Sequence, residues 1–490
     1  MTAIHAARPP RSRAGRFLNQ KPGFPIILTI YPSSDAIPAG ILCSPVCVLG
    51  LKTGNVTTDR PAGQQKRHMG LNRLIAQPWV EQSMRTLFTC CLLVFLGLSG
   101  CALPERLLAV PKALTTQAKM TEGNVTGPAN IRFWVNQDPA PLAKEGLESL
   151  RREREYLAQS GHTGPLPPVA FLAISGGSDN GAFAAGVLNG WTATGDRPEF
   201  KVVTGVSTGA LIAPLAFLGP EYDDELKTAY TTISKKDIYE ERGLLAALFD
   251  DGLVDSHPLL KLISTYVTPE LLARIAAEYA KGRLLLVGTT DLDSRQPVIW
   301  NMTAIAAIGD PGALDLFRKI LVASASVPGV FPPVMFNVEA DGTPYQEMHV
   351  DGGAMAQVIL YPPYFSLGEF AEEHQAERTR TLYLIRNARL DPDWASVDRG
   401  VLDIAGRAVS SLIYSQGLGD LYRIYLVTQR DGFDYNLAYI DSDFTAPHEE
   451  EFDTGYMRQL YDYGYEQARG GYHWHKYPPA YAPPDESKTQ

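Results

Sequence analysis

A repeated strand–turn–helix pattern most strongly constrains what this chain can fold into. The continuous apolar run Val169–Ser175 is typical of a strand buried on both faces. A glycine-rich turn, Gly176–Gly181, follows, and then an apolar helical stretch from Ala182 to about Trp191. Residues 200–218 repeat the same order of strand, turn and helix. This alternation predicts a βαβ unit in an α/β fold with a mainly parallel central sheet.

Other parts of the chain add strands and helices to this unit. Arg283–Thr290 and Thr381–Ile385 are further apolar runs of strand length. Val334–Val338 and Glu347–Val350 flank an Asp341-Gly342 turn, which is a hairpin signal. Shorter strands are expected at 131–135 and 297–300, and helices at 142–156, 225–230, 244–249, 259–266, 271–279, 314–325, 400–418 and 452–469.

Charge is distributed unevenly along the 490 residues. Residues 1–100 hold 11 Lys and Arg against three acidic residues, whereas the remainder holds 33 basic and 51 acidic residues. The remainder therefore carries a net charge of −18. Nucleic-acid binding needs a basic surface, so no nucleic-acid partner is expected.

All five cysteines fall within the first 101 residues, which points to a targeting segment there. From Met84, one arginine precedes an apolar run of about a dozen residues, too short to span a bilayer. The run ends in Leu98-Ser-Gly-Cys101, which resembles a bacterial lipobox. This resemblance implies a signal peptide at 84–100 and lipidation of Cys101. A buried apolar helix with a chance cysteine is the alternative.

The lipobox also sets expectations for the rest of the N-terminus and for location. Residues 1–83 are rich in Pro, Arg and Gly without a sustained period, and we interpret them as a mis-annotated or disordered extension. Ala102 stands where an aspartate would imply retention at the inner membrane. The expected location is therefore the bacterial cell envelope, lipid-anchored at the outer membrane.

Gly205-Val-Ser-Thr-Gly209 has the G-x-S-x-G pattern of a nucleophile elbow between a strand and a helix. The two glycines let the backbone turn without a Cβ clash. Ser207 is expected at the tip, with its hydroxyl exposed in front of a helix N-terminus.

The turn Gly176–Gly181 precedes a predicted helix in the same way. Backbone N–H groups at a helix N-terminus stabilise the negative oxygen of an acyl-transfer transition state. A phosphate-binding loop or a plain turn are the alternatives. However, the run is not G-x-G-x-x-G, and it lacks the Gly-Lys-Ser/Thr of a P-loop.

Asp351 closes a predicted strand and is followed by Gly352 and Gly353. A serine hydroxyl needs a base to take its proton, and partial burial would raise the proton affinity of a carboxylate. A lone Asp-Gly usually marks a turn, but together with an elbow serine it indicates a general base.

These segments, with the small-residue stretch Val322–Pro333 between them, resemble the patatin-like phospholipases in order and spacing. The resemblance implies a three-layer α/β/α fold and a Ser-Asp dyad, with Ser207 as nucleophile and Asp351 as base. It further implies an oxyanion hole from Gly176, Gly177 and the Ser178 amide, and motif glycines at 181, 205, 209, 352 and 353. The implied activity is hydrolysis of lipid acyl esters, phospholipids among them, through an acyl-enzyme, with no cofactor and no metal.

Two positions depart from the family pattern, because Ser178 replaces a third loop glycine and Asn180 replaces a basic residue. Loss of this cation could weaken binding of anionic headgroups, so the expected class is lipid acyl hydrolase rather than phospholipase alone. The expected organisation is a lipid-anchored tether with an N-terminal helix at 101–165, a hydrolase domain at 166–475 and a flexible tail at 476–490.

Two other functions stay open at this point. An α/β-hydrolase esterase would use a Ser-His-Asp triad, with its histidine downstream of the aspartate. The candidates for that histidine are His374, His448, His473 and His475. The second alternative is a non-catalytic envelope lipoprotein. His349 is interpreted as a packed strand residue and Asp291-Leu-Asp293 as a loop rather than a metal site.

Overall fold

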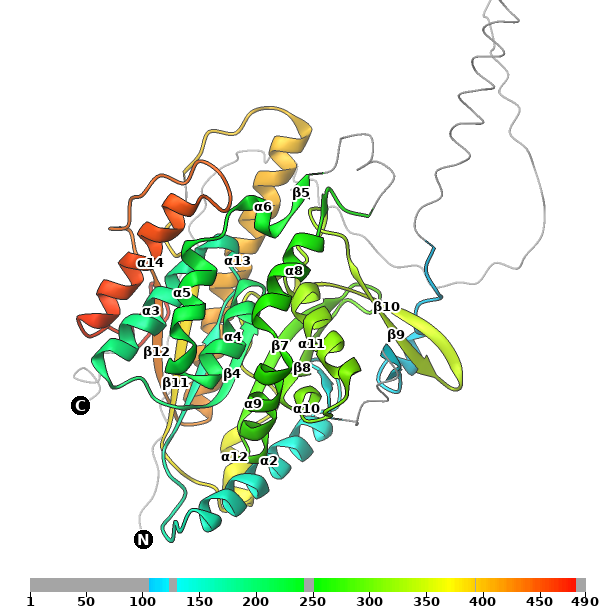
Figure 1. Cartoon of the computed structure of the whole chain (residues 1–490), viewed down its shortest axis with the longest axis vertical. Helices are drawn as coiled ribbons and strands as arrows, with labels where there is room; N and C mark the ends of the chain where they lie inside the picture. Colours follow the sequence, from blue (N-terminus) through cyan, green and yellow to red (C-terminus); the bar gives the residue numbers. More distant parts are fainter. Residues whose placement is uncertain (1–104, 123–129, 242–250, 393, 482–490) are drawn as a thin grey trace, which may run out of the picture. The chain divides into compact units, whose positions relative to one another are not determined.

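The computed structural model describes residues 105–122, 130–241, 251–392 and 394–481 (Figure 1). The predicted extension, the signal peptide, Cys101 and the helix expected at 244–249 all lie outside these residues. No helix within the described ranges combines the length and apolar character needed to cross a bilayer.

Five parallel strands form the centre of the sheet. They are β3 (Val169–Ile174), β4 (Phe200–Val206), β7 (Leu284–Asp291), β11 (Arg380–Arg389) and β12 (Phe433–Ile440), in the spatial order β7-β4-β3-β11-β12. The expected α/β fold with a parallel central sheet is confirmed. The carboxyl ends of these strands share one edge, where ligands bind in open α/β sheets.

Antiparallel strands extend the sheet beyond β7. β9 (Val334–Ala340) and β10 (Thr343–Asp351) form the predicted hairpin, with positive φ at Asp341 and Gly342 in its two-residue turn. β8 (Gln296–Asn301) pairs with β7 and with β2 (Arg132–Trp134). Three strands have only two residues: β1 (Lys119–Met120) joins β9 in the same sheet, whereas β5 (Glu240–Glu241) and β6 (Val254–Asp255) pair with each other in a separate sheet.

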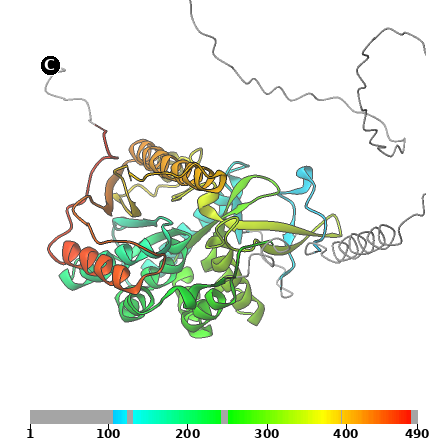
Figure 2. The same cartoon turned by 90° about the horizontal axis from the view of Figure 1, so that it is seen from above.

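Helices cover both faces of the sheet, which gives the three layers expected from the resemblance (Figure 2). On one face they pack against alternate strand residues such as Leu172, Val203 and Leu285. These helices are α3 (Gly181–Thr194), α4 (Thr208–Leu218), α5 (Asp223–Thr231), α6 (Lys235–Ile238), α8 (His257–Tyr266), α9 (Pro269–Ala280), α10 (Met302–Ala306), α11 (Pro311–Ser324) and α14 (Thr454–Arg469).

On the other face, Phe171, Val202 and Leu284 point away from that layer, as strand alternation requires. They are covered by α2 (Ala140–Gln159), α12 (Leu367–Glu373) and α13 (Val401–Arg430). Figure 2 shows α13 across the sheet from α14.

Helix α13 is longer than the sequence pattern predicts, since the expected helix ended at residue 418. Glycines at 417 and 419 have low helix propensity, so the sequence does not favour a helix that continues past them. A Cβ at Gly417 would lie 2.3 Å from a guanidinium nitrogen of Arg386, so this glycine provides space for a tertiary contact. The expected boundary was therefore wrong because tertiary packing overrides local propensity.

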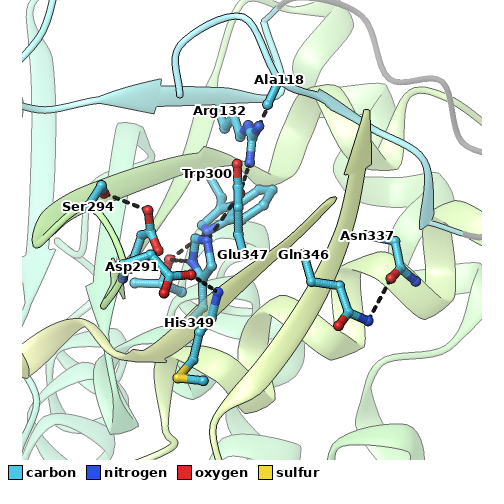
Figure 3. A network of polar contacts seen from close by, with 12 residues as sticks. Ala118, Arg132, Asp291, Ser294, Trp300, Asn337, Gln346, Glu347 and His349 are labelled. Atoms are coloured by element: carbon cyan, nitrogen blue, oxygen red, sulfur yellow. Dashed lines mark hydrogen bonds and ion pairs between the residues drawn. The ribbon is translucent and has the colours of Figure 1, made fainter. Parts of the chain in front are cut away.

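A buried polar network joins β2, β7 and β10 (Figure 3). Arg132 on β2 forms an ion pair with Glu347 on β10, and its second terminal nitrogen donates to the Ala118 carbonyl at 2.7 Å. His349 on β10 contacts Glu347 through Nε2 at 3.3 Å. Its Nδ1 lies 2.9 Å from the Thr289 hydroxyl. The network therefore fixes the strand that carries Asp351.

Replacing Arg132 by Met is expected to lower the free energy of unfolding by about 3–5 kcal/mol, because Glu347 would keep a buried charge without its cation. Burial opposes ionisation of Glu347, yet Arg132 and His349 hold the pKa of its carboxyl below the ordinary value. Urea unfolding at neutral pH measures the loss.

The double variant Arg132→Met/Glu347→Leu should recover most of that stability, since no unpaired charge remains. Arg151 forms exposed pairs with Glu148 and Glu155 and serves as the matched control. Arg151→Met should cost less than about 1 kcal/mol. A loss for Arg132→Met no larger than that of the control would contradict the assignment.

Candidate active site

Ser207 lies at a sharp turn between β4 and α4. Its backbone has φ 56° and ψ −126°, a conformation that costs energy for a residue with a side chain. A Cβ at Gly205 would lie 2.3 Å from the carbonyl oxygen of Gly209. One at Gly209 would lie equally close to the Ile174 carbonyl. The strand, the turn and the helix approach one another so closely that both positions require glycine.

A second serine holds this turn in place. The amide of Ser207 donates to Oγ of Ser324 at 3.0 Å, and that hydroxyl donates to the Gly288 carbonyl on β7 at 2.7 Å. Ser324 ends α11 and is fully buried. Sequence reasoning did not identify it, although it belongs to the small-residue stretch Val322–Pro333.

The sheet register brings Asp351 next to the elbow. Strand β7 pairs with β8 along one edge. Along its opposite edge it pairs with β4 through residues 284–288 and then with β10 through residues 289–291. β4 leaves this edge at Val206, opposite Gly288, and β10 ends there with Asp351 opposite Thr289. Ser207 and Asp351 therefore meet at the carboxyl end of β4, although they lie 144 positions apart in the sequence.

The Asp351 carboxyl is buried and only partly satisfied. Its Oδ1 accepts a 2.6 Å hydrogen bond from the Gly353 amide. Its Oδ2 has no hydrogen-bond partner within the described residues. Burial raises the pKa of Asp351 to about 6, while the Ser207 hydroxyl and the Gly353 amide oppose part of that shift. A carboxylate with this pKa is a far better proton acceptor than one in water.

The glycine-rich loop lies beside the elbow, but one of its amides is already used. The Gly176 amide donates to the Gln357 carbonyl at 2.9 Å, so this donor is engaged. A Cβ at Gly176 would lie 3.1 Å from Cβ of Ser207. Gly177 has φ 157° and Ser178 has φ 54°. These two residues carry the amides that remain as candidate oxyanion donors.

The other predicted motif glycines provide close contacts around the site. A Cβ at Gly181 would lie 2.3 Å from the Thr208 hydroxyl. One at Gly352 would lie 2.6 Å from the Gly288 carbonyl, and one at Gly353 would lie 2.7 Å from the side-chain nitrogen Nε2 of Gln357. The loop, the elbow and the Asp351 turn are thus packed against one another without room for side chains.

Asn387, a residue that sequence reasoning missed, anchors the loop from β11. Its side chain donates to the Ser175 carbonyl at 2.9 Å and accepts from the Ala184 amide at 3.2 Å. Its own amide donates to the Ser175 hydroxyl. A Cβ at Gly177 would lie 2.1 Å from the Asn387 carbonyl, which explains why the loop needs a glycine there.

A distant histidine supports the other end of the loop. Nε2 of His448 lies 2.8 Å from Oδ2 of the buried Asp179, which also accepts from the Phe452 amide. The His448 ring stacks on Tyr456 at 4.1 Å, and the Tyr456 hydroxyl donates to Asn180. Residues 448–456 therefore fix the turn that carries Ser178.

No histidine of the described residues hydrogen-bonds to Ser207 or Asp351. The other histidines of the proposed triad have different partners: His374 contacts the Phe370 carbonyl, and His475 pairs with Leu437 through the backbone and contacts His473. His349 is fully buried within β10. None of these contacts joins a histidine to Ser207 or Asp351.

The described residues contain no group of three or more His, Cys, Asp or Glu side chains that could hold a metal ion. Asp293 pairs with Arg106, and Asp291 accepts from Ser294. The loop expected at Asp291-Leu-Asp293 begins one residue later, because Asp291 is the last residue of β7 and Leu292 and Asp293 open the turn that follows.

The fold and these contacts define an α/β protein in which a serine on a strained strand–helix turn lies beside a buried carboxyl. Comparison with known families extends this: residues 172–362 match the family model described as Patatin-like phospholipase. The match assigns a patatin-like phospholipase family-model domain to this part of the chain. The matched range contains the elbow, the glycine-rich loop and Asp351.

Solved structures add a distant likeness. The chain is similar to VipD from Legionella pneumophila, with 12% sequence identity and a TM-score of 0.32. The alignment covers 62% of this chain and 66% of that one, just under two thirds of its length. No curated protein matches the sequence.

Proposed function

We propose that this protein hydrolyses acyl esters of lipids through an acyl-enzyme on Ser207. One observation carries the proposal: a strained elbow serine lies beside a buried aspartate whose pKa is raised to about 6. Both belong to the domain that matches the patatin-like phospholipases.

In the proposed reaction, the Ser207 oxygen attacks the ester carbonyl carbon while Asp351 Oδ2 takes the hydroxyl proton. The amides of Gly177 and Ser178 stabilise the oxyanion of the tetrahedral intermediate. Collapse breaks the ester bond, and the proton on Asp351 goes to the leaving alkoxide. Water then attacks the acyl-enzyme with Asp351 again as base, releasing a fatty acid and restoring the Ser207 hydroxyl.

An apolar pocket next to the elbow fits the acyl chain of such a substrate. It measures about 590 Å³, including space open to solvent, and begins at Ser178 and Thr208. Its apolar lining between α4, α5 and α8 includes Leu211, Leu215, Ile233, Leu262, Ile263 and Tyr266.

Replacing Leu211 by Trp should shorten the acyl chains that the enzyme accepts, because the larger side chain would fill the pocket beside Thr208. We expect kcat/KM for a palmitoyl ester to fall by about tenfold or more. Turnover of a butyryl ester should stay within about twofold. Kinetics on an acyl-length series measure this, with Leu211→Ala as the control that widens the pocket. An equal loss for both chain lengths would argue against this pocket.

Replacing His448 by Ala should lower kcat about tenfold, because Asp179 would lose a charge-assisted hydrogen bond and the turn carrying Ser178 would lose its support. KM should change little. His448→Gln places an amide donor near the Nε2 position and should recover much of the loss, which a triad histidine would not allow. Steady-state kinetics of the two variants separate these roles.

The missing loop cation bears on the substrate class. The side chain of Asn180 accepts a hydrogen bond from Tyr456 at 2.6 Å and carries no charge for a phosphate group. We therefore propose neutral acyl esters and lysolipids as substrates alongside phospholipids. Fatty-acid release from each class, measured by mass spectrometry, tests the activity. No release from any of them by the folded protein would refute the proposed function.

We further propose that the protein is a lipoprotein of the bacterial cell envelope, lipid-anchored at Cys101 and located at the outer membrane. The proposal is supported by the lipobox-like Leu98–Cys101 alone. Metabolic labelling with palmitate should mark the wild-type protein but not Cys101→Ser. Labelling of both would refute the anchor.

A further inference from the structure

The first half of α13 extends beyond the carboxyl end of the sheet. The helix connects β11 to β12, which are parallel, so it must run in the opposite direction. Gly417 packs against Arg386 near the end of β11. The 16 residues before Gly417 form a helical segment about 24 Å long that leads from this point past the strand ends. Figure 1 shows this part of α13 beyond the sheet edge.

The second half of α13 is attached to the candidate active site. Oδ2 of Asp420 accepts a 2.6 Å hydrogen bond from the Gln357 amide and a longer one from Val358. The Gln357 carbonyl in turn accepts from Gly176 in the glycine-rich loop. The projecting half is thus continuous with a helix fixed at the edge where Ser207 lies.

The projecting half is amphipathic, and the rest of the described chain leaves its apolar face uncovered. No described side chain between Val401 and Gln416 is buried. Val401 is 83% exposed and Leu412 is 70% exposed. The spacing i, i+3, i+4, i+7, i+8, i+11 and i+12 places one apolar stripe along the helix. Its members are Val401, Ile404, Ala405, Ala408, Val409, Leu412 and Ile413.

The loop before α13 adds an exposed aromatic residue. Trp394 is 87% exposed, and Val397 nearby is also exposed. Between residues 394 and 416, Asp398 and Asp403 balance Arg399 and Arg407, so the segment carries no net charge. Exposed apolar patches of this kind mark binding surfaces, and tryptophan favours the boundary between water and lipid.

We propose that Trp394 and the apolar stripe of α13 insert into the surface of a zwitterionic lipid bilayer. An uncovered amphipathic helix with an adjacent tryptophan has the character of an interfacial helix. The absence of excess cations favours apolar insertion over attraction to anionic headgroups. This inference rests on the proposed function. The inserted helix would bring the carboxyl edge of the sheet, where Ser207 lies, to lipids within a membrane.

Flotation with phosphatidylcholine vesicles tests this in the full chain carrying Cys101→Ser, so that no acyl anchor contributes. The parent protein should float with the vesicles, and Leu412→Glu should lower its partition coefficient about tenfold or more. Ser410→Glu adds the same charge to the polar face and should stay within about twofold. Turnover of dissolved p-nitrophenyl butyrate should be the same in all three proteins, which also shows that they are folded.

The Ser207→Ala protein should float like the parent while losing ester turnover. Vesicle binding and ester hydrolysis are therefore tested separately. Equal flotation of Leu412→Glu and Ser410→Glu would overturn the proposal. So would light scattering in which Leu412→Glu dissociates a dimer without changing flotation, since a second copy would then cover the stripe.

Discussion

Replacing Ser207 by Ala is expected to lower kcat by about 10⁴-fold or more, because the proposed mechanism forms its acyl-enzyme on this hydroxyl. The substitution removes one oxygen atom at a position whose backbone is fixed by Ser324, Gly205 and Gly209. The fold should therefore persist. Turnover of a soluble ester, with circular dichroism as the folding control, measures the effect.

The matched control is Ser178→Ala, which keeps the backbone amide that the mechanism uses and removes only a neighbouring hydroxyl. Its kcat should stay within about tenfold of wild type. If Ser207→Ala retained as much activity as Ser178→Ala, the elbow serine would not be the nucleophile, and a non-catalytic or different chemistry would have to be considered.

Replacing Asp351 by Asn should separate activity from stability. The amide cannot accept the Ser207 proton, so kcat should fall by about 10²–10⁴-fold. The same change removes a carboxylate that burial makes unfavourable, so the variant should unfold less readily than wild type at pH 7. Urea unfolding and steady-state kinetics on the same preparations measure both effects.

The expected gain in stability of Asp351→Asn follows from the direction in which folding shifts the Asp351 pKa. The Asp351 pKa is raised from 3.8 to about 6 in the folded protein. A group whose pKa is raised by folding stabilises the folded protein at a pH below its pKa in the unfolded chain. This stabilisation is lost as the pH rises through its pKa in the folded protein. At pH 7 the loss amounts to about 3 kcal/mol. Asp351→Asn should therefore gain up to that amount at pH 7 and nothing near pH 3. A variant less stable than wild type at pH 7 would contradict the burial of an ionised carboxyl.

The sequence predicts the parts of the site that have local signals. Apolar runs followed by glycine-rich turns and helices are short-range patterns, so β3, β4, α3 and α4 lie where they were expected. The elbow around Ser207 is likewise a five-residue pattern with one backbone solution. The hairpin before Asp351 follows from Asp341-Gly342, whose two residues both adopt positive φ.

The supporting residues have no such signal because their partners are far away in the sequence. Asn387 lies 212 positions from Ser175, and His448 lies 269 positions from Asp179. Asn387 reaches the loop from β11, and His448 reaches it from the segment that precedes α14, so only the tertiary fold brings them together. The engaged amide of Gly176 depends in the same way on Gln357, so a motif alone could not separate used donors from available ones.

The most direct test of the dyad is the rate at which a fluorophosphonate reacts with the protein, with the modified residue located by mass spectrometry. The account predicts a single adduct on Ser207, formed at a rate that rises with pH through about 6, and formed far more slowly in Asp351→Asn. An adduct on another residue, or an Asp351→Asn protein that reacts at the wild-type rate, would contradict it.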